Sequence, residues 1–145
     1  MNKLKGLIFT ALLLAGCATL DQTNMDWIPI GPEFPPTKAK DIEIIGGRKD
    51  VTRPYGNLGL LRIKNIKPTR DSIHMGIEKG KKFAASKGAN AMQVGQYNSA
   101  EDGATDPHIT LILYLIKYVD NLTPQDEKAI ENFKEVGILN ERASR

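Results

Sequence analysis

The 145-residue sequence contains a single cysteine, Cys17, so the chain cannot form an internal disulfide. Histidine is almost as scarce, since only His74 and His108 are present. A zinc site needs three or four ligands, and each histidine has only one aspartate close to it in the sequence, Asp71 or Asp106. The folded part of the chain must therefore depend on a hydrophobic core, and we expect no metal site.

The sequence also lacks familiar catalytic motifs, since it contains no GxSxG, no HExxH and no paired-carboxylate motif. Residues 76–82 (GIEKGKK) approach a phosphate-binding loop, but their glycines are one residue too close together and Lys82 replaces the metal-binding hydroxyl. Glu101, Asp102 and Asp106 crowd one segment without the alternating spacing of a calcium loop. We therefore expect no catalytic residue and no cofactor.

Neither sign of charge dominates the whole chain, which has 20 Lys and Arg against 17 Asp and Glu, so a nucleic-acid partner is not expected. The charge is nevertheless uneven. Residues 48–87 hold eleven basic and three acidic residues, a net charge of +8, whereas residues 98–145 hold five basic and nine acidic residues. This polarity indicates either two solvated faces of opposite sign or a patch for an anionic partner such as a phosphorylated lipid or glycan. The candidate patch consists of Arg48, Lys49, Arg53, Arg62 and Lys64.

The longest apolar run near the N-terminus, residues 7–14 (LIFTALLL), is far shorter than the roughly 20 residues of a membrane-spanning helix. Two lysines precede it and two small residues follow it, which is the order of regions in a secretory signal peptide. The next residues complete the string LAGC (14–17), which resembles the lipobox of bacterial lipoproteins. The resemblance implies cleavage between Gly16 and Cys17 and transfer of a diacylglycerol, with fatty acids such as palmitate, to the Cys17 thiol.

A diacylglyceryl group on Cys17 is a durable anchor, because two acyl chains hold a protein stably at a membrane where one holds it only marginally. This covalent lipid is the only added group that we expect. Ala18 follows the cysteine where, by the same resemblance, an aspartate would signal retention at the inner membrane. In a cell with two membranes we therefore expect the protein in the cell envelope, on the periplasmic face of the outer membrane.

Residues 17–40 contain four prolines and little periodicity, so we predict an extended tether between the lipid and the folded domain. As a polyproline-like spacer, a tether of this length would reach roughly 70 Å. Four large apolar side chains are unusual in a spacer, and we expect them to dock either on the chain's own domain or on a partner: Trp27, Ile28, Ile30 and Phe34. Residues 41–137 are predicted to form one domain, followed by a frayed tail over residues 138–145.

The domain is predicted to be α+β, with a four-stranded, mostly antiparallel sheet, the order β-β-α-β-β-α, and one or two helices packed on the sheet. The predicted strands are 42–45, 58–66, 91–97 and 109–119, with a polar loop over residues 98–108. The last strand is apolar on both faces, which indicates a strand that is central or covered on both sides.

The first predicted helix starts near Asp71, after a proline and capping residues. Gly76 and Gly80 share its apolar face, which predicts a close approach of the helix to the sheet, and Gly88 fits the left-handed residue after the helix end. The second helix is predicted to open at Thr123-Pro124 and to end at Gly137. Its predicted buried stripe consists of Ala129, Ile130, Phe133 and Val136.

Three short motifs in this domain are distinctive: residues 34–37 (FPPT), the pair Leu58-Gly59, and residues 87–91 (KGANA). Together they resemble small envelope lipoproteins related to the Rcs stress-sensor lipoprotein, over about residues 34–118. The sequence departs from the stress sensor in one respect, because the sensor's fold is stapled by disulfides and this domain has no cysteine after Cys17. The resemblance therefore does not carry over a sensing role.

These observations favour a membrane-anchored, non-enzymatic module that binds an envelope protein or an envelope polymer. One alternative is a binder of anionic glycolipid or metal through the basic region 48–87, whose affinity would fall steeply with salt. Another is a small envelope enzyme, which would have a polar pocket containing a strongly perturbed titrating group.

Overall fold

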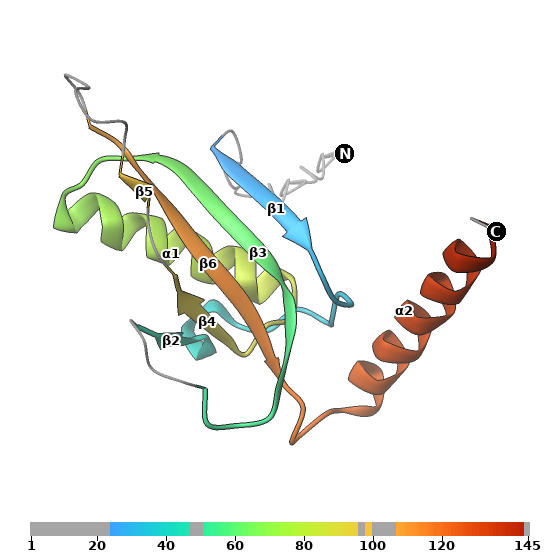
Figure 1. Cartoon of the computed structure of the whole chain (residues 1–145). Helices are drawn as coiled ribbons and strands as arrows, with labels where there is room; N and C mark the ends of the chain where they lie inside the picture. The colour runs from blue at the N-terminus through green and yellow to red at the C-terminus, as the bar shows by residue number, and fades with distance from the viewer. Residues whose placement is uncertain (1–23, 47–50, 96–97, 100–106, 144–145) are drawn as a thin grey trace, which may run out of the picture.

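The computed structural model describes residues 24–46, 51–95, 98–99 and 107–143 (Figure 1). These residues form one mixed β-sheet and two α-helices. In chain order the elements are β1 (Met25–Pro29), the 3₁₀ helix η1 (Ala39–Asp41), β2 (Glu43–Ile45), β3 (Tyr55–Ile66), α1 (Arg70–Ser86), β4 (Ala91–Val94), β5 (Asn98–Ser99), β6 (Ile109–Tyr118) and α2 (Pro124–Ala143).

The sheet has six strands, of which five follow the order β1-β3-β6-β4-β2, while β5 pairs with the start of β6. The α+β class predicted from the sequence is confirmed, and β6 is central as expected. The prediction of four mostly antiparallel strands needs two corrections. Strands β1 and β5 are additional, and β2 pairs in parallel with β4. The parallel pair arises because β3 and α1 lie between these two strands in the chain, so the connection crosses over rather than turning back.

Strand β1 lies within the segment that was predicted to be a tether, so the folded domain begins near Asn24 and not at residue 41. It pairs antiparallel with β3, from Met25 opposite Ile63 to Pro29 opposite Gly59. At the sheet edge, Pro29 removes no hydrogen bond that the ladder needs, which is why a proline-rich segment can supply a strand. Docking on the chain's own domain is confirmed for Trp27 and Phe34, whereas Ile28 and Ile30 are 41% and 57% exposed.

Both of these aromatics belong to the hydrophobic core. The Trp27 ring meets the Phe83 ring edge-on, with 5.3 Å between the ring centroids. Phe34 is only 7% exposed and is part of the same core cluster as Phe83. Residues 27 and 34 therefore fasten the N-terminal segment to the helix and the sheet.

Helix α1 covers one face of the sheet, behind the strands in Figure 1. Thr69 caps its first turn by accepting a hydrogen bond from the Ser72 backbone N–H, and Gly88 follows the helix with a φ of 76°. The predicted close approach is also confirmed, because a Cβ on Gly76 would lie 2.6 Å from Leu111 Cδ1 and one on Gly80 would contact Leu113 Cδ1. The main core lies between this helix and the buried leucines of β3 and β6.

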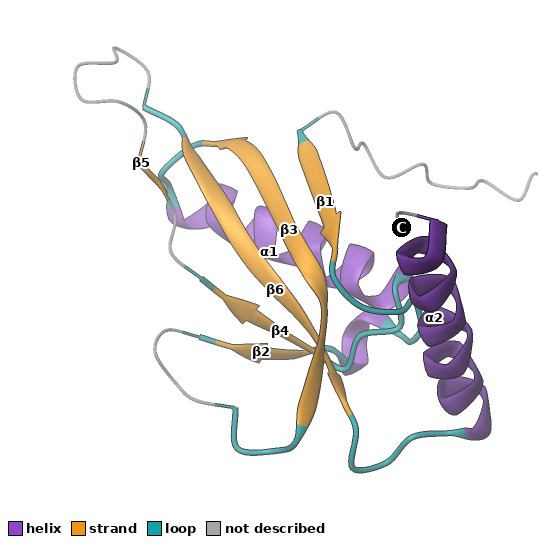
Figure 2. Ribbon diagram, turned by 45° about the vertical axis from the view of Figure 1, so that its right-hand side comes forward, coloured by secondary structure: helices purple, strands orange, loops and turns teal. Residues whose placement is uncertain are grey.

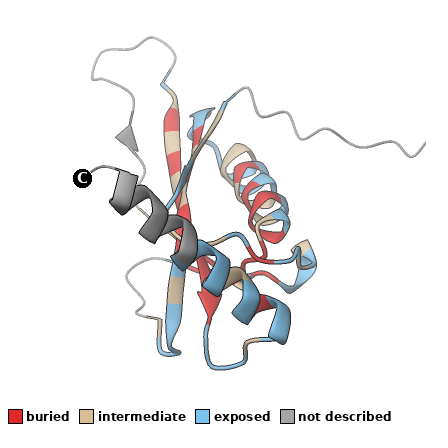
Figure 3. Ribbon diagram, turned by 90° about the vertical axis from the view of Figure 1, so that its right-hand side faces the viewer, coloured by how far each residue is buried: buried red, intermediate tan, exposed pale blue. Residues whose placement is uncertain are grey.

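Neither helix covers the opposite face of the sheet. Helix α1 lies on the other side of it (Figure 3), and α2 stands to one side of the sheet, beyond β1, in Figures 1 and 2. At one end of this face, a second and smaller cluster buries Ile45, Ala91, Ile116 and Tyr118. Over the rest of it, side chains of β1 and β6 remain exposed. Strand β6 is therefore central, in agreement with the prediction that it is central or covered on both sides, and it is buried on its second face at its C-terminal end.

Helix α2 differs from the prediction in two respects. It continues past Gly137 to Ala143, because glycine weakens a helix without preventing it. Only Ala129 and Ile130 of the predicted stripe pack against the core, while Phe133 is 48% exposed and the Val136 side chain lies outside the described residues. The predicted tail therefore begins as helix. Among the described residues, no helix is long and apolar enough to cross a membrane.

Candidate functional site

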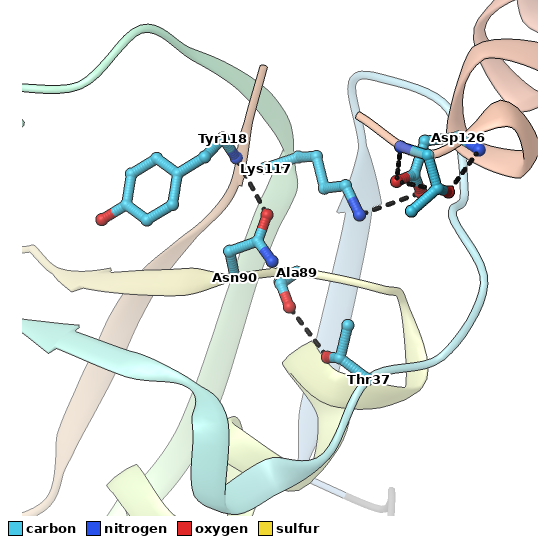
Figure 4. A network of polar contacts seen from close by, with 7 residues as sticks. Thr37, Ala89, Asn90, Lys117, Tyr118 and Asp126 are labelled. Atoms are coloured by element: carbon cyan, nitrogen blue, oxygen red, sulfur yellow. Dashed lines mark hydrogen bonds and ion pairs between the residues drawn. The ribbon is translucent and has the colours of Figure 1, made fainter. Parts of the chain in front are cut away.

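The motifs that suggested a resemblance have packing roles around the end of α1. The Phe34 backbone N–H donates to the Lys87 carbonyl at 3.3 Å, and the Thr37 hydroxyl donates to the Ala89 carbonyl at 2.8 Å (Figure 4). At Gly88 a Cβ would lie 2.5 Å from the Cβ of Phe34, so residues 34–37 wrap closely over the turn after the helix. This wrapping places residues 89–91 at the start of β4.

Asn90 links the ends of three strands. Its backbone carbonyl accepts from the Glu43 N–H at 3.0 Å and its own N–H donates to the Ile116 carbonyl at 2.8 Å. Its side-chain Oδ1 accepts from the Tyr118 backbone N–H at 3.0 Å (Figure 4). The residue thereby positions Tyr118 beside β2, on the face of the sheet that α1 does not cover.

Tyr118 is the centre of a polar cleft at this end of the sheet. Its hydroxyl donates to Glu43 Oε2 at 2.6 Å, and the Arg53 guanidinium stacks over its ring at 3.9 Å from the centroid. Arg53 is itself held by Asp120, with distances of 2.8 Å from Nε to Oδ2 and 2.6 Å from Nη2 to Oδ1. Two adjoining cavities of about 210 and 220 Å³ are both lined by Glu43, Arg53 and Tyr118. We call this site the Tyr118 cleft, and Asp41, Asn90 and Asn121 complete its polar lining.

The electrostatics of the Tyr118 cleft determine what its groups can do. Burial raises the pKa of Tyr118 to about 12, and the hydrogen bond and negative charge of Glu43 act in the same direction. The Arg53 guanidinium lowers the pKa of Asp120, and Asp120 in turn raises the pKa of Arg53. Tyr118 therefore stays protonated at neutral pH, where it serves as a hydrogen-bond donor and not as a base.

A row of apolar side chains lies on the same uncovered face, nearer the middle of the sheet. Ile28 of β1 stands opposite Leu60 of β3, which stands opposite Tyr114 of β6. Ile28 and Tyr114 are each 41% exposed, while Leu60 and the neighbouring Ile112 are half-buried. We call Ile28, Leu60, Ile112 and Tyr114 the open-face row.

The predicted basic patch does not assemble among the described residues. Arg53 precedes β3 and pairs with Asp120, whereas Arg62 and Lys64 lie toward the other end of that strand. Both of these pair with Asp26, at 3.3 and 2.6 Å. The other two members of the predicted patch, Arg48 and Lys49, lie outside the described residues.

The remaining predicted sites are only partly described. Gly16 and Cys17, together with the acidic segment 101–106, lie outside the described residues. His74 is exposed on α1, and His108 is half-buried just before β6. The described part of the chain contains no group of three or more residues of the types that commonly bind a metal.

Sequence reasoning missed the Tyr118 cleft and the buried Lys117 beside it. Lys117 is 5% exposed in a strand that was otherwise recognised as apolar. A lysine at an inward position of such a strand, followed by Asp126 in the first turn of a helix, was the available signal for a buried ion pair.

No protein-family model and no curated protein matches the chain. A solved structure, the orthorhombic crystal form of a Francisella virulence factor, FvfA, is similar to it with a TM-score of 0.48 and 18% sequence identity. The similarity covers 63% of this chain and 94% of the virulence factor's chain.

Proposed function

We propose that this protein is a lipid-anchored envelope lipoprotein whose folded domain binds a partner protein and does not act as an enzyme. The observation that carries the proposal is the open-face row, because its apolar side chains are exposed on a sheet face that neither described helix covers. Contiguous apolar surface of this kind typically marks a protein–protein contact. Tyr114 is the natural centre of the contact, since aromatic side chains dominate the energetics of interfaces.

Polar side chains flank the open-face row on both sides, measured along the strands, as expected for the rim of an interface. On one side, the single carboxylate of Asp26 pairs with both Arg62 and Lys64, so one of these two positive charges is balanced. On the other side is the Tyr118 cleft, where Arg53 is balanced by Asp120. Because Arg53, Arg62 and Lys64 are each already paired with a carboxylate, the surface favours an apolar contact with a protein over recognition of an anionic polymer or glycolipid.

The anchor in this proposal is the diacylglyceryl group on Cys17, argued above from the leader and the LAGC string. Domains fixed to a membrane meet their partners at a high effective concentration, so a modest contact area is sufficient for binding. A small open-face row is therefore compatible with a working interaction surface at the membrane.

The Tyr118 cleft is the feature that a catalytic alternative would use. A general acid or base works best when its pKa lies near the operating pH, and the pKa of Tyr118 moves away from neutrality to about 12. The hydroxyl is also already engaged by Glu43 at 2.6 Å. We therefore assign the cleft a binding or structural role and propose no reaction.

The test is site-specific photo-crosslinking in living cells, with a photoreactive aromatic amino acid at position 114. The matched control carries the same group at Lys82, which is exposed on α1, on the other side of the sheet. We expect one discrete crosslinked protein from position 114 and none from position 82. Equal labelling from both positions, or none from position 114, would overturn the proposed binding face, and capture of a glycan would replace the protein partner with an envelope polymer.

A further inference from the structure

The structure shortens the connection between the proposed lipid anchor and the folded domain. The Lys64 N–H donates to the Asn24 carbonyl at 2.8 Å, and Asn65 Nδ2 donates to Asn24 Oδ1 at 3.1 Å, so the domain starts at Asn24. Seven residue steps separate Cys17 from Asn24, and a fully extended chain of that length spans about 25 Å. A lipid on Cys17 would therefore hold this end of the sheet close to the membrane.

The same end of the sheet carries a surface suited to lipid. Asn65, which has a φ of 59°, lies in an irregular stretch of pairing at the end of β3, just before the turn into α1. This turn and the first turns of the helix enclose a cavity of about 250 Å³, lined in part by Ile66, Lys67, Met75 and Lys79. We call these four residues the Met75 face, and it adjoins the point where the chain from Cys17 enters the fold.

The chemistry of the Met75 face matches a membrane surface. Met75 is 63% exposed, the largest exposed fraction among the large apolar side chains that the structure describes as exposed. Lys67 and Lys79 are exposed beside it, and the described residues that line the cavity include no acidic side chain. Lysines can lay their methylene stems along an apolar surface while their ammonium groups meet anionic lipid headgroups.

We infer that the Met75 face rests on a phospholipid bilayer that contains anionic headgroups, an inference that depends on the proposed lipid anchor on Cys17. The sheet then stands away from the membrane, because β1 and β6 begin and β3 ends at the same end of it (Figure 1). Tyr118 lies at the far end of the ten-residue strand β6, about 30 Å from the membrane-proximal end. The open-face row lies between these ends, where a partner protein can reach it from the side.

The test uses the lipidated chain in vesicles of phosphatidylethanolamine and phosphatidylglycerol, some of which carry nitroxide-labelled phospholipid. A fluorophore is attached through Met75→Cys in one sample and through Lys128→Cys, on the exposed surface of α2, in the matched control. The lipid on Cys17 blocks the native thiol, so only the introduced cysteine is labelled. We expect quenching by the nitroxide lipid to be at least about threefold stronger at position 75, since quenching of this kind requires close contact.

Charge reversal provides a second measurement on the folded chain. Lys67→Glu together with Lys79→Glu changes only exposed side chains and is expected to remove most of the quenching at position 75. Equal quenching at positions 75 and 128, or quenching that the two reversals leave unchanged, would overturn the assignment of the Met75 face. Flotation of the same chain with vesicles is read separately, and a chain that does not float would refute the lipid anchor itself.

Discussion

Lys117 and Asp126 form a buried ion pair, with 2.9 Å between Nζ and Oδ1 and side-chain exposures of 7% and 5%. Burial alone would raise the pKa of Asp126, but hydrogen bonds from Thr123 and Lys117, together with the Lys117 charge, lower it below its usual value. The Lys117 ammonium also lies 4.8 Å from the centroid of the Phe34 ring. The pair thereby joins the end of β6 to the first turn of α2 and to the N-terminal segment (Figure 4).

Removing one partner of this pair should destabilise the domain strongly. Lys117→Met leaves the Asp126 carboxylate buried without its counter-charge, which typically costs about 3–5 kcal/mol. Lys128→Met changes an exposed lysine on α2, and its free energy of unfolding should stay within about 0.5 kcal/mol of the wild-type value. Urea unfolding of both variants measures the difference, and equal free energies of unfolding would show that the ion pair does not anchor α2.

Gly80 should tolerate a larger side chain less well than the neighbouring Lys79. A Cβ at position 80 would lie 3.0 Å from Met92 Sδ and in contact with Leu113 Cδ1, so Gly80→Leu overpacks the contact between α1 and the sheet. Overpacking typically lowers the free energy of unfolding by about 1–3 kcal/mol. Helix propensity alone predicts that replacing this glycine raises it by up to about 1 kcal/mol. Lys79→Leu, on the exposed side, is the control. A Gly80→Leu protein that unfolds at higher urea than the Lys79→Leu protein would contradict the packing of α1.

The Tyr118 hydroxyl should make stability depend on alkaline pH. Its pKa is raised to about 12 in the folded protein, from 10.0 for an unperturbed tyrosine. The contribution of the protonated hydroxyl to the free energy of unfolding is therefore complete below pH 10 and is lost as the pH rises from 10 toward 12. Since each pKa unit corresponds to 1.36 kcal/mol, the stability advantage of the wild type over Tyr118→Phe should shrink by up to about 2 kcal/mol across this range. Urea melts at several alkaline pH values measure it, and an advantage that is constant with pH would refute the buried Tyr118–Glu43 contact.

Local patterns in the sequence predicted the parts of the fold that depend on local chemistry. The cap at Thr69, the glycine face of α1 and the apolar run of β6 were readable because each is encoded by neighbouring residues. Strand β1 was not readable, since Pro29 and the surrounding prolines give the same pattern as a spacer. Its identity as a strand comes from pairing with β3, about 35 residues further along the chain.

The candidate site was less predictable than the fold, because its contacts join distant parts of the sequence. Glu43 meets Tyr118 across 75 residues, and Arg53 meets Asp120 across 67 residues. A local count of charge predicted a basic patch, but it could not show that three of its members form ion pairs with Asp26 and Asp120. Among the described members of the patch, Arg53 is paired near the start of β3, whereas Arg62 and Lys64 are paired toward its other end.

The lipid anchor on Cys17 is tested most directly by the intact mass and the N-terminal peptide of the protein purified from membranes of a bacterial host. We expect residues 1–16 to be absent and the new N-terminal Cys17 to carry a diacylglyceryl group, while Cys17→Ser abolishes fatty-acid incorporation. A protein that retains Met1, or that has an unmodified Cys17 after cleavage, would contradict the lipid anchor and the membrane-surface role built on it.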